Sequence, residues 1–155
     1  MMNSTHKVLL GAAIVTLLVA VFATLPSMDE KQLNINSPQT VNHVDVDRYL
    51  GRWYEQASIP ANFEKGCVNT QAFYSLIDSK TIKVDNLCYV DGKKKESLGK
   101  GFIEDNTNAK LKVVFNPIFK FGGQYWIVKL GDAQNYGYSV VSSPDYKYLW
   151  ILSRE

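Results

Sequence analysis

The sequence predicts an all-β fold, an eight-stranded antiparallel up-and-down β-barrel. Short apolar segments follow one another at even spacing from residue 45 onward, and each ends at a group of turn residues. Within several segments apolar and charged residues alternate, as Ile82 and Val84 do with Lys83 and Asp85. Closing such a sheet removes its exposed edges, and an eight-stranded barrel can hold one small ligand. A two-sheet sandwich is the alternative that spacing alone does not exclude.

The composition describes one globular domain. The chain has 155 residues, of which 46% are hydrophobic and 21% charged, so it can build a real core. A net charge of +2 gives no reason to expect a nucleic-acid partner. His6 and His43 precede the domain, no Cys/His cluster has metal-site spacing, and no glycine-rich phosphate loop is present. We therefore expect no metal, no cofactor and no catalytic residue.

The N-terminus predicts export. Residues 8–25 carry no charge and follow a short segment with one lysine, which fits residues 1–25 as a signal peptide cleaved after Ala23 or as an N-terminal membrane anchor. No cysteine follows the apolar run as a lipid-attachment site would require. Residues 26–43 are expected to form a polar linker or arm. The domain would then lie in the periplasm or at the outer membrane of a bacterium, or be secreted by another host, where disulfides persist.

The elements of the domain follow from local signals. Asp45 and Gly51 flank one predicted helical turn as its N-terminal cap and its terminator. Asp91-Gly92 predicts a tight hairpin turn, because glycine tolerates the positive φ that such turns need. The predicted strands are residues 53–59, 68–77, 82–90, 97–104, 110–115, 125–130, 138–142 and 148–153.

Three stretches resemble the lipocalin family. "YLGRWYE" at 49–55 is similar to the G-x-W signature of the first lipocalin strand, and "YLWILSR" at 148–154 resembles the last-strand signature ending in arginine. "GDAQNYGYSVV" at 131–141 resembles the middle signature, with Asp132 and Tyr136 further apart than usual. The resemblance covers about residues 44–154 of a domain expected at 44–155, and it extends to the subgroup of bacterial outer-membrane lipocalins and apolipoprotein D.

The resemblance implies roles for individual residues. Gly51 belongs to the first signature, Trp53 plugs the closed end of the barrel, and Arg154 packs across its indole face, which is a structural role. The family places five side chains in the cavity, and the period of two extends this inward set by four more. The nine residues are Tyr74, Asn86, Phe115, Trp150, Leu152, Ala72, Val84, Leu111 and Val113. The implied ligand is a fatty acid, a lysophospholipid or another hydrophobic amphiphile; the alternative is that these side chains fill a dry core.

Lipocalins continue after the last-strand arginine into a helix that packs on the barrel. This sequence stops at Glu155, so we expect that helix to be missing. An exposed apolar flank and a homodimer would be consequences.

Lysines gather in the loops expected at the open end of the barrel. Lys65, Lys93, Lys94, Lys95 and Lys120 lie there, whereas the loops of the other end are acidic. One hypothesis is that the open end docks on an anionic membrane or accepts an anionic head group. The alternative is that these lysines only solvate the loops.

Cys67 and Cys88 fall almost opposite each other in the predicted hairpin of the second and third strands. A disulfide is the favoured reading, although alternation points Cys67 outward and Cys88 inward, and a bulge near residues 66–69 would reconcile them. An unbonded Cys88 would instead be a cavity thiol, as in isomerase-type lipocalins. A third reading is a scavenger module that binds a protein partner through its loops.

Overall fold

The computed structural model describes residues 37–115, 122–132 and 134–155. The predicted signal or anchor, most of the predicted arm, and Lys120 lie outside these residues. Within the described part of the chain, no helix has both the length and the apolar character needed to cross a membrane.

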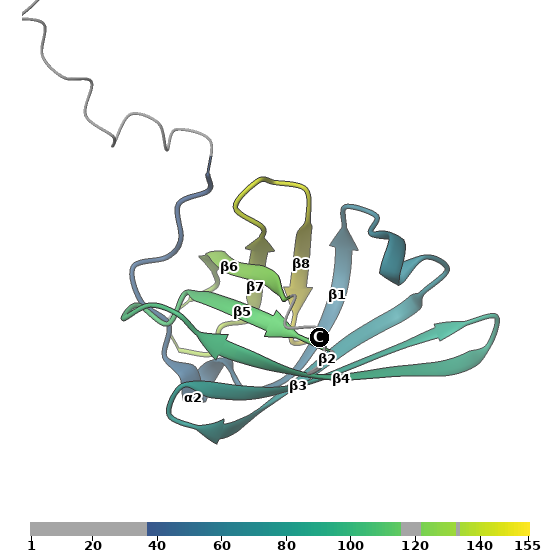
Figure 1. The fold of residues 1–155 in the computed structure, drawn as a ribbon, viewed down its shortest axis with the longest axis horizontal. Coiled ribbons are helices and arrows are strands. Elements are labelled where there is room, and N and C mark those ends of the chain that lie inside the picture. The colour runs from purple at the N-terminus through teal and green to yellow at the C-terminus, as the bar shows by residue number, and fades with distance from the viewer. Residues whose placement is uncertain (1–36, 116–121, 133) are drawn as a thin grey trace, which may run out of the picture. The chain divides into compact units, whose positions relative to one another are not determined.

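Eight antiparallel strands form a closed barrel in simple sequence order, and the last strand pairs back onto the first (Figure 1). The predicted up-and-down barrel is therefore confirmed over the sandwich. The strands are β1 (Gly51–Ser58), β2 (Val68–Asp78), β3 (Thr81–Val90), β4 (Lys93–Ile103), β5 (Lys110–Val114), β6 (Gly123–Leu130), β7 (Tyr138–Ser142) and β8 (Leu149–Ser153). Their bounds match the expected segments to within two residues, with one exception.

The exception is the start of β4. The sequence predicts a loop at Lys93, Lys94 and Lys95, but all three belong to the strand, which pairs with β3 from Val90–Lys93 onward. Asp91 and Gly92 alone make the turn, with φ of 51° and 75°. Positive φ at both central residues gives a two-residue hairpin turn whose twist matches the flanking strands, so pairing resumes at once.

The chain enters the barrel through a single helical turn, α2 (Val46–Tyr49). The Asp45 side chain caps it by accepting a hydrogen bond from the Arg48 backbone N–H, and Leu50 ends it. Gly51 then adopts φ of +91°, a conformation that side-chain-bearing residues rarely adopt, and starts β1. The predicted cap and terminator are both confirmed. One 3-10 turn, η2 (Asn62–Glu64), interrupts the connection from β1 to β2.

The residues before α2 contact the barrel. The Val41 N–H donates to the Ile127 carbonyl at 3.0 Å, and the Val44 N–H donates to the Thr107 carbonyl at 2.8 Å. Val44 is almost completely buried and belongs to the same core cluster as Trp53. The end of the predicted arm is thus part of the packed domain.

Candidate ligand cavity and closed end of the barrel

Trp53 is fully buried in β1, and the Arg154 guanidinium carbon lies 3.7 Å from the centre of its ring system. The indole N–H donates to the Tyr49 carbonyl at 2.9 Å. Arg154 donates from its two terminal nitrogens to the carbonyls of Arg52 and Arg48, at 2.8 and 2.6 Å. The stack expected from the resemblance is therefore present, and backbone acceptors fix the guanidinium in place.

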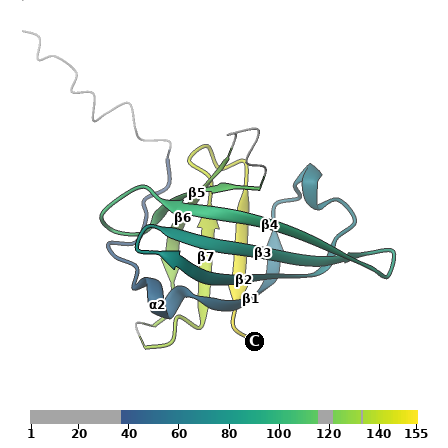
Figure 2. The ribbon, with the colours of Figure 1, turned by 60° about the horizontal axis from the view of Figure 1, so that its bottom comes forward.

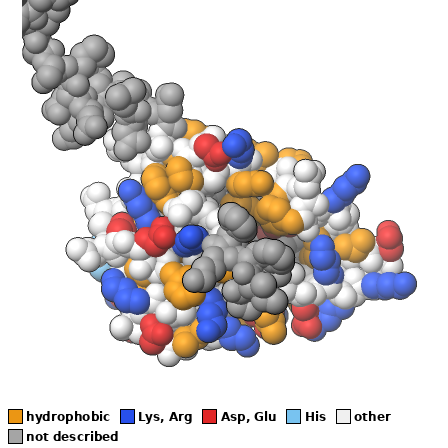
Figure 3. Space-filling model, in the orientation of Figure 1, with side chains coloured by type: hydrophobic (Ala, Val, Ile, Leu, Met, Phe, Trp, Pro, Cys, Tyr) orange, Lys and Arg blue, Asp and Glu red, His pale blue; other side chains and the backbone are white. Residues whose placement is uncertain are grey.

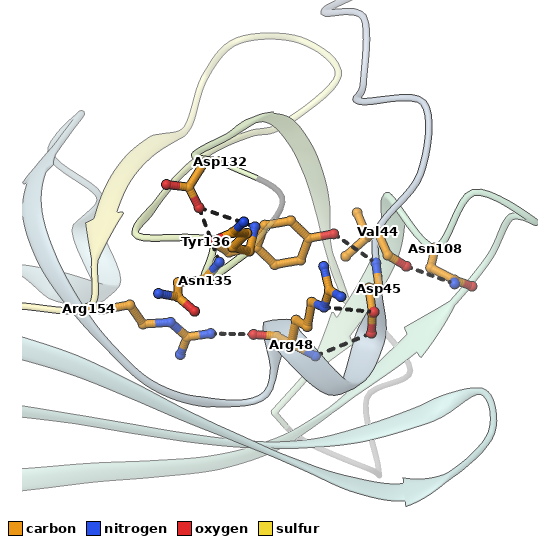
Figure 4. A network of polar contacts seen from close by, with 9 residues as sticks. Val44, Asp45, Arg48, Asn108, Asp132, Asn135, Tyr136 and Arg154 are labelled. Atoms are coloured by element: carbon orange, nitrogen blue, oxygen red, sulfur yellow. Dashed lines mark hydrogen bonds and ion pairs between the residues drawn. The ribbon is translucent and has the colours of Figure 1, made fainter.

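The middle signature reaches the same end of the barrel (Figure 4). Tyr136 is buried with φ of 46°, and its hydroxyl accepts a hydrogen bond from the Asp45 N–H at 3.1 Å. The Asp132 carboxylate accepts from the Gln134 and Asn135 N–H groups and so shapes the turn that presents Tyr136. The three signature stretches thus meet around α2 and close this end.

Buried tyrosines form the floor of the barrel interior. The Tyr49 hydroxyl lies 3.0 Å from Ser139 Oγ and 2.7 Å from the Tyr125 hydroxyl, which lies 3.2 Å from the Tyr74 hydroxyl. Four hydroxyls are therefore joined by three hydrogen bonds. Each hydroxyl can donate one proton, so four hydroxyls have one donor more than the three hydrogen bonds use. When the bonds run from Ser139 through Tyr49 and Tyr125 to Tyr74, the unused donor is the Tyr74 hydroxyl.

Burial sets the protonation of this floor. It raises the pKa of Tyr74 to about 12, and it also raises the pKa of Tyr49 and of Tyr125 well above the usual tyrosine value. All three therefore remain neutral hydroxyls at physiological pH. A neutral hydroxyl can both donate to and accept from a polar ligand group.

Above this floor lies a cavity of about 500 Å³. All of the predicted lining residues except one face it: Tyr74, Asn86, Phe115, Trp150, Leu152, Ala72, Val84 and Val113. The exception is Leu111, which points inward as the period of two predicts but packs in the buried core and does not line the cavity. It lies closer to the closed end than Val113, where neighbouring side chains already fill the interior.

Asn86 supplies a polar atom without a partner in the cavity wall. Its Oδ1 is buried and accepts no hydrogen bond from any described residue. An unsatisfied buried acceptor costs about 1–3 kcal/mol, so a ligand hydroxyl or N–H that reaches it would remove that penalty.

The turn η2 is tied across the open end by side chains from β4 and β8. The Trp150 indole N–H donates to Glu64 Oε2 at 3.2 Å, and Lys95 Nζ donates to the Phe63 carbonyl at 3.1 Å. Burial raises the pKa of Glu64, while the bond from Trp150 acts against that rise. Sequence reasoning missed Glu64 because nothing local marks a loop carboxylate that a distant strand will cover.

The lysines predicted for the open end have different surroundings. Lys95 lines the cavity, Lys94 is ion-paired with Glu96, and Lys65 and Lys93 are exposed. Tyr125 also lines the cavity and was not among the predicted residues, although it alternates with Ile127 along β6 and the period of two could have found it.

Cys67 and Cys88 form a disulfide, as the favoured reading of the sequence predicted. The pairing of β2 with β3 shifts register between Val68 and Gln71, where Asn69 has φ of 53°. This is the bulge expected near residues 66–69, and it turns Cys67 inward so that both cysteines line the cavity. In this state Cys88 carries no thiol, and the described residues contain no free cysteine.

Comparison with known proteins agrees with this geometry. A family model for a lipocalin-like domain matches residues 44–155. The chain is 38% identical over 124 residues to temperature-induced lipocalin-1 of Arabidopsis thaliana, covering 75% of this chain and 66% of the relative. It is 38% identical over 121 residues to the outer membrane lipoprotein Blc of Vibrio cholerae (76% and 69% covered) and 38% identical over 133 residues to apolipoprotein D of Mus musculus (76% and 65% covered). The chain therefore spans about two thirds of the length of these relatives.

A solved structure shares the fold. Insecticyanin from the tobacco hornworm Manduca sexta aligns with a TM-score of 0.55 at 24% sequence identity, over 77% of this chain and 67% of that one. The closed barrel, the Trp53–Arg154 stack and the family match together define the class of protein. The chain belongs to the lipocalin family, and its relatives include the bacterial outer-membrane lipoproteins and apolipoprotein D.

Proposed function

We propose that the protein binds one single-chain amphiphile, such as a fatty acid or a lysophospholipid, in the barrel cavity and carries it outside the cytoplasm. The observation that carries this proposal is the cavity itself, of about 500 Å³. Its lining is mainly apolar and aromatic, with Glu55, Glu64 and Lys95 as charged members. Among the described residues, the buried Asn86 Oδ1 is the side-chain acceptor left without a partner. The cavity volume lies in the usual range for small-molecule sites, about 300–1,000 Å³.

The energetics favour an acyl chain. Each buried methylene contributes about 0.8 kcal/mol, so a chain of about a dozen gains roughly 10 kcal/mol before the costs of immobilisation. Asn86 and Tyr74 would add specificity, because Ala72 pairs with Asn86 and Tyr74 with Val84, which makes the two polar residues diagonal neighbours on the inner face. A ligand hydroxyl between them can donate to Asn86 and accept from Tyr74.

The disulfide state of Cys88 favours ligand binding without catalysis. The Cys88 sulfur is bonded to Cys67, so it cannot act as the nucleophilic thiol of an isomerase-type mechanism. The relatives named an outer membrane lipoprotein and an apolipoprotein support an exported location. At the open end, exposed Phe63, Lys65 and Lys93 would bring the cavity mouth to an anionic membrane that supplies the lipid.

A fluorescent polyene fatty acid, cis-parinaric acid, tests the proposal by its emission on binding and its displacement by oleate or lysophosphatidylcholine. Val84→Phe fills the cavity wall, and we expect it to lower affinity at least about tenfold. Asp85→Phe, the next residue on the opposite face of β3, is the matched control and should bind as the wild type does. Equal loss in both variants, or no binding by the wild type, would reject a cavity ligand.

A further inference from the structure

A second apolar hollow lies on the outer face of the barrel, over strands β2 to β5. Its volume is about 710 Å³, and its apolar lining consists of Ile77, Leu98, Phe102, Val114 and Phe115. Leu98 is 59% exposed, Ile77 49% and Phe102 41%, although strand positions that face water are normally polar. Figure 2 shows β2, β3 and β4 side by side on this side of the barrel. We call this hollow the outer groove.

Three lysines complete the lining of the outer groove. Lys83 of β3 lies directly opposite Lys100 of β4, and Lys112 of β5 is diagonal to Lys100, because Lys100 pairs with Val114 and Phe102 with Lys112. Like charges directly opposite each other destabilise a sheet. Figure 3 shows Lys or Arg side chains with Asp or Glu side chains among them along the lower part of the molecule, where β3 and β4 lie in Figure 1.

None of these three lysines forms an ion pair within 4 Å with a described carboxylate. The ion pairs within 4 Å among the described residues are Arg48–Asp45, Lys94–Glu96 and Lys147–Asp145. The described lining of the groove includes no acidic residue. Acids border the lining without belonging to it: Asp85 pairs with Leu98, and Glu104 is two residues from Phe102. The pKa of Asp78 is lowered chiefly by the Lys80 N–H and in part by the charge of Lys100. The groove therefore combines an exposed apolar floor with three lysines that no described carboxylate contacts directly.

Phe115 forms a wall shared by the outer groove and the cavity, since it lines both. Its close approach to β4 depends on Gly99: a Cβ there would lie 2.8 Å from Phe115 Cδ1 and 2.9 Å from the Val114 carbonyl oxygen. The two hollows are thus separate sites with a common aromatic partition.

We propose that the outer groove is a second binding site for a single-chain anionic amphiphile, with the acyl chain along the apolar floor and the anionic head group between Lys83, Lys100 and Lys112. The paired lysines favour an anionic ligand, because an anionic head group relieves the Lys83–Lys100 repulsion and a neutral lipid does not. Each exposed contact is weak alone, but three lysines around one carboxylate act together with chain burial. This site is independent of the proposed cavity function.

The test is photo-cross-linking of the full chain with a diazirine-bearing palmitate analogue below its critical micelle concentration, followed by peptide mapping. We expect cross-links at outward-facing Leu98, Phe102 and Val114 in addition to those inside the cavity. The triple variant Lys83→Gln, Lys100→Gln, Lys112→Gln should lower the outer cross-links at least about tenfold and retain the cavity cross-links. The matched control replaces three exposed basic side chains elsewhere, Arg52, Lys129 and Lys147, by glutamine and should retain both sets.

The outcomes separate the alternatives. Cavity cross-links without outer ones would overturn the groove proposal and leave the cavity function standing, and the reverse pattern would do the opposite. Equal outer labelling by the matching neutral diazirine alcohol, unchanged in the triple variant, would mean nonspecific apolar adhesion and would also overturn it. So would lysine-dependent sedimentation with phosphatidylglycerol vesicles but not labelling by monomeric palmitate, because the groove would then be a membrane-docking surface.

Discussion

Arg154 covers the exposed side of the Trp53 ring system with its guanidinium carbon 3.7 Å from the ring centre, and two backbone carbonyls hold the guanidinium there. The carbonyls belong to Arg48, in α2, and Arg52, in β1, so the last residues of the chain fasten the first turn of the domain. The closed end of the barrel is thereby a unit built from both ends of the domain sequence.

A double-mutant cycle on this pair should give non-additive losses of stability. Trp53→Ala removes a fully buried ring and should lower the free energy of unfolding by about 3–5 kcal/mol. Arg154→Ala should lose less in the Trp53→Ala background than in the wild type, by about 1 kcal/mol. Urea unfolding of the four proteins measures the coupling, and additive losses would show that the stack contributes nothing.

Removing a hydroxyl from the middle of the tyrosine floor should cost more stability than removing one from its end. Tyr49→Phe deletes the hydroxyl that joins Ser139 to Tyr125, and a loss of about 1–3 kcal/mol is expected because buried partners lose a bond. Tyr74→Phe deletes only the terminal hydroxyl and should lower the free energy of unfolding by about 1 kcal/mol or less. Equal losses would indicate that the four hydroxyls do not form the chain described.

The same floor predicts a decline of stability in alkali. The folded-state pKa of Tyr74 is about 12, above the ordinary value of 10.0, so between these values the folded protein keeps a proton that the unfolded chain releases. Stability is therefore fully present below about pH 10 and is lost as the pH rises towards 12. Urea unfolding at stepped alkaline pH measures this slope, and Tyr74→Phe should make it shallower; an identical slope in the variant would contradict the assignment.

Glu64→Gln should make the folded protein more stable at neutral pH. Burial raises the pKa of Glu64, so the folded state favours the protonated form, and stability is lost as the pH rises through the folded-state pKa. Glu64→Gln removes the ionisation and keeps an oxygen that can accept from Trp150. We expect a higher Tm than the wild type at about pH 7 and no difference near pH 3.

Trp150→Phe is the companion variant for this test. It removes the donor that favours the ionised carboxylate, so the benefit of Glu64→Gln at neutral pH should grow in that background. A Tm difference that is the same at every pH would show that the Glu64 charge is not the cause.

Two glycines of β4 should differ sharply when replaced by alanine. A Cβ at Gly99 would stand 2.8 Å from Phe115 Cδ1 and 2.9 Å from a backbone carbonyl oxygen, whereas one at Gly101 meets only side-chain atoms at 3.5 Å or more. Gly99→Ala should lower the free energy of unfolding by about 1–3 kcal/mol, and Gly101→Ala should be nearly neutral. Thermal unfolding of both variants checks this, and equal effects would mean that Phe115 does not pack on Gly99.

The disulfide gives a further prediction. Cys67 and Cys88 are separated by 21 positions, and replacing both by alanine should lower the free energy of unfolding by about 2–4 kcal/mol, since the unfolded chain loses its cross-link. Thiol titration of the unreduced, denatured wild type should detect no free thiol. Two free thiols would revive the reading of Cys88 as a cavity nucleophile.

Much of the fold followed from the sequence because alternation and turn residues are local signals. The period of two placed Ala72, Val84 and Val113 on the inner face, and Asp91-Gly92 located a hairpin turn. Alternation failed where the register changes: it pointed Cys67 outward, and the bulge between Val68 and Gln71 turned it inward.

The remaining features depend on contacts between distant strands. Leu111 faces inward, but whether an inward side chain meets a cavity or a packed core depends on the depth of the floor, which Tyr49 and Tyr125 set together. The outer groove likewise needs the register of β3 with β4, because Lys83 and Lys100 become neighbours only when the two strands pair. No local pattern contains that information.

Native mass spectrometry of the full chain, purified without detergent and followed by solvent extraction of bound lipid, tests the central claim most directly. We expect a discrete mass adduct that solvent releases as a fatty acid or lysophospholipid, and we expect less of it on Val84→Phe than on Asp85→Phe. A clean unliganded mass that does not change on adding oleate or lysophosphatidylcholine would contradict the claim that the cavity is a lipid site.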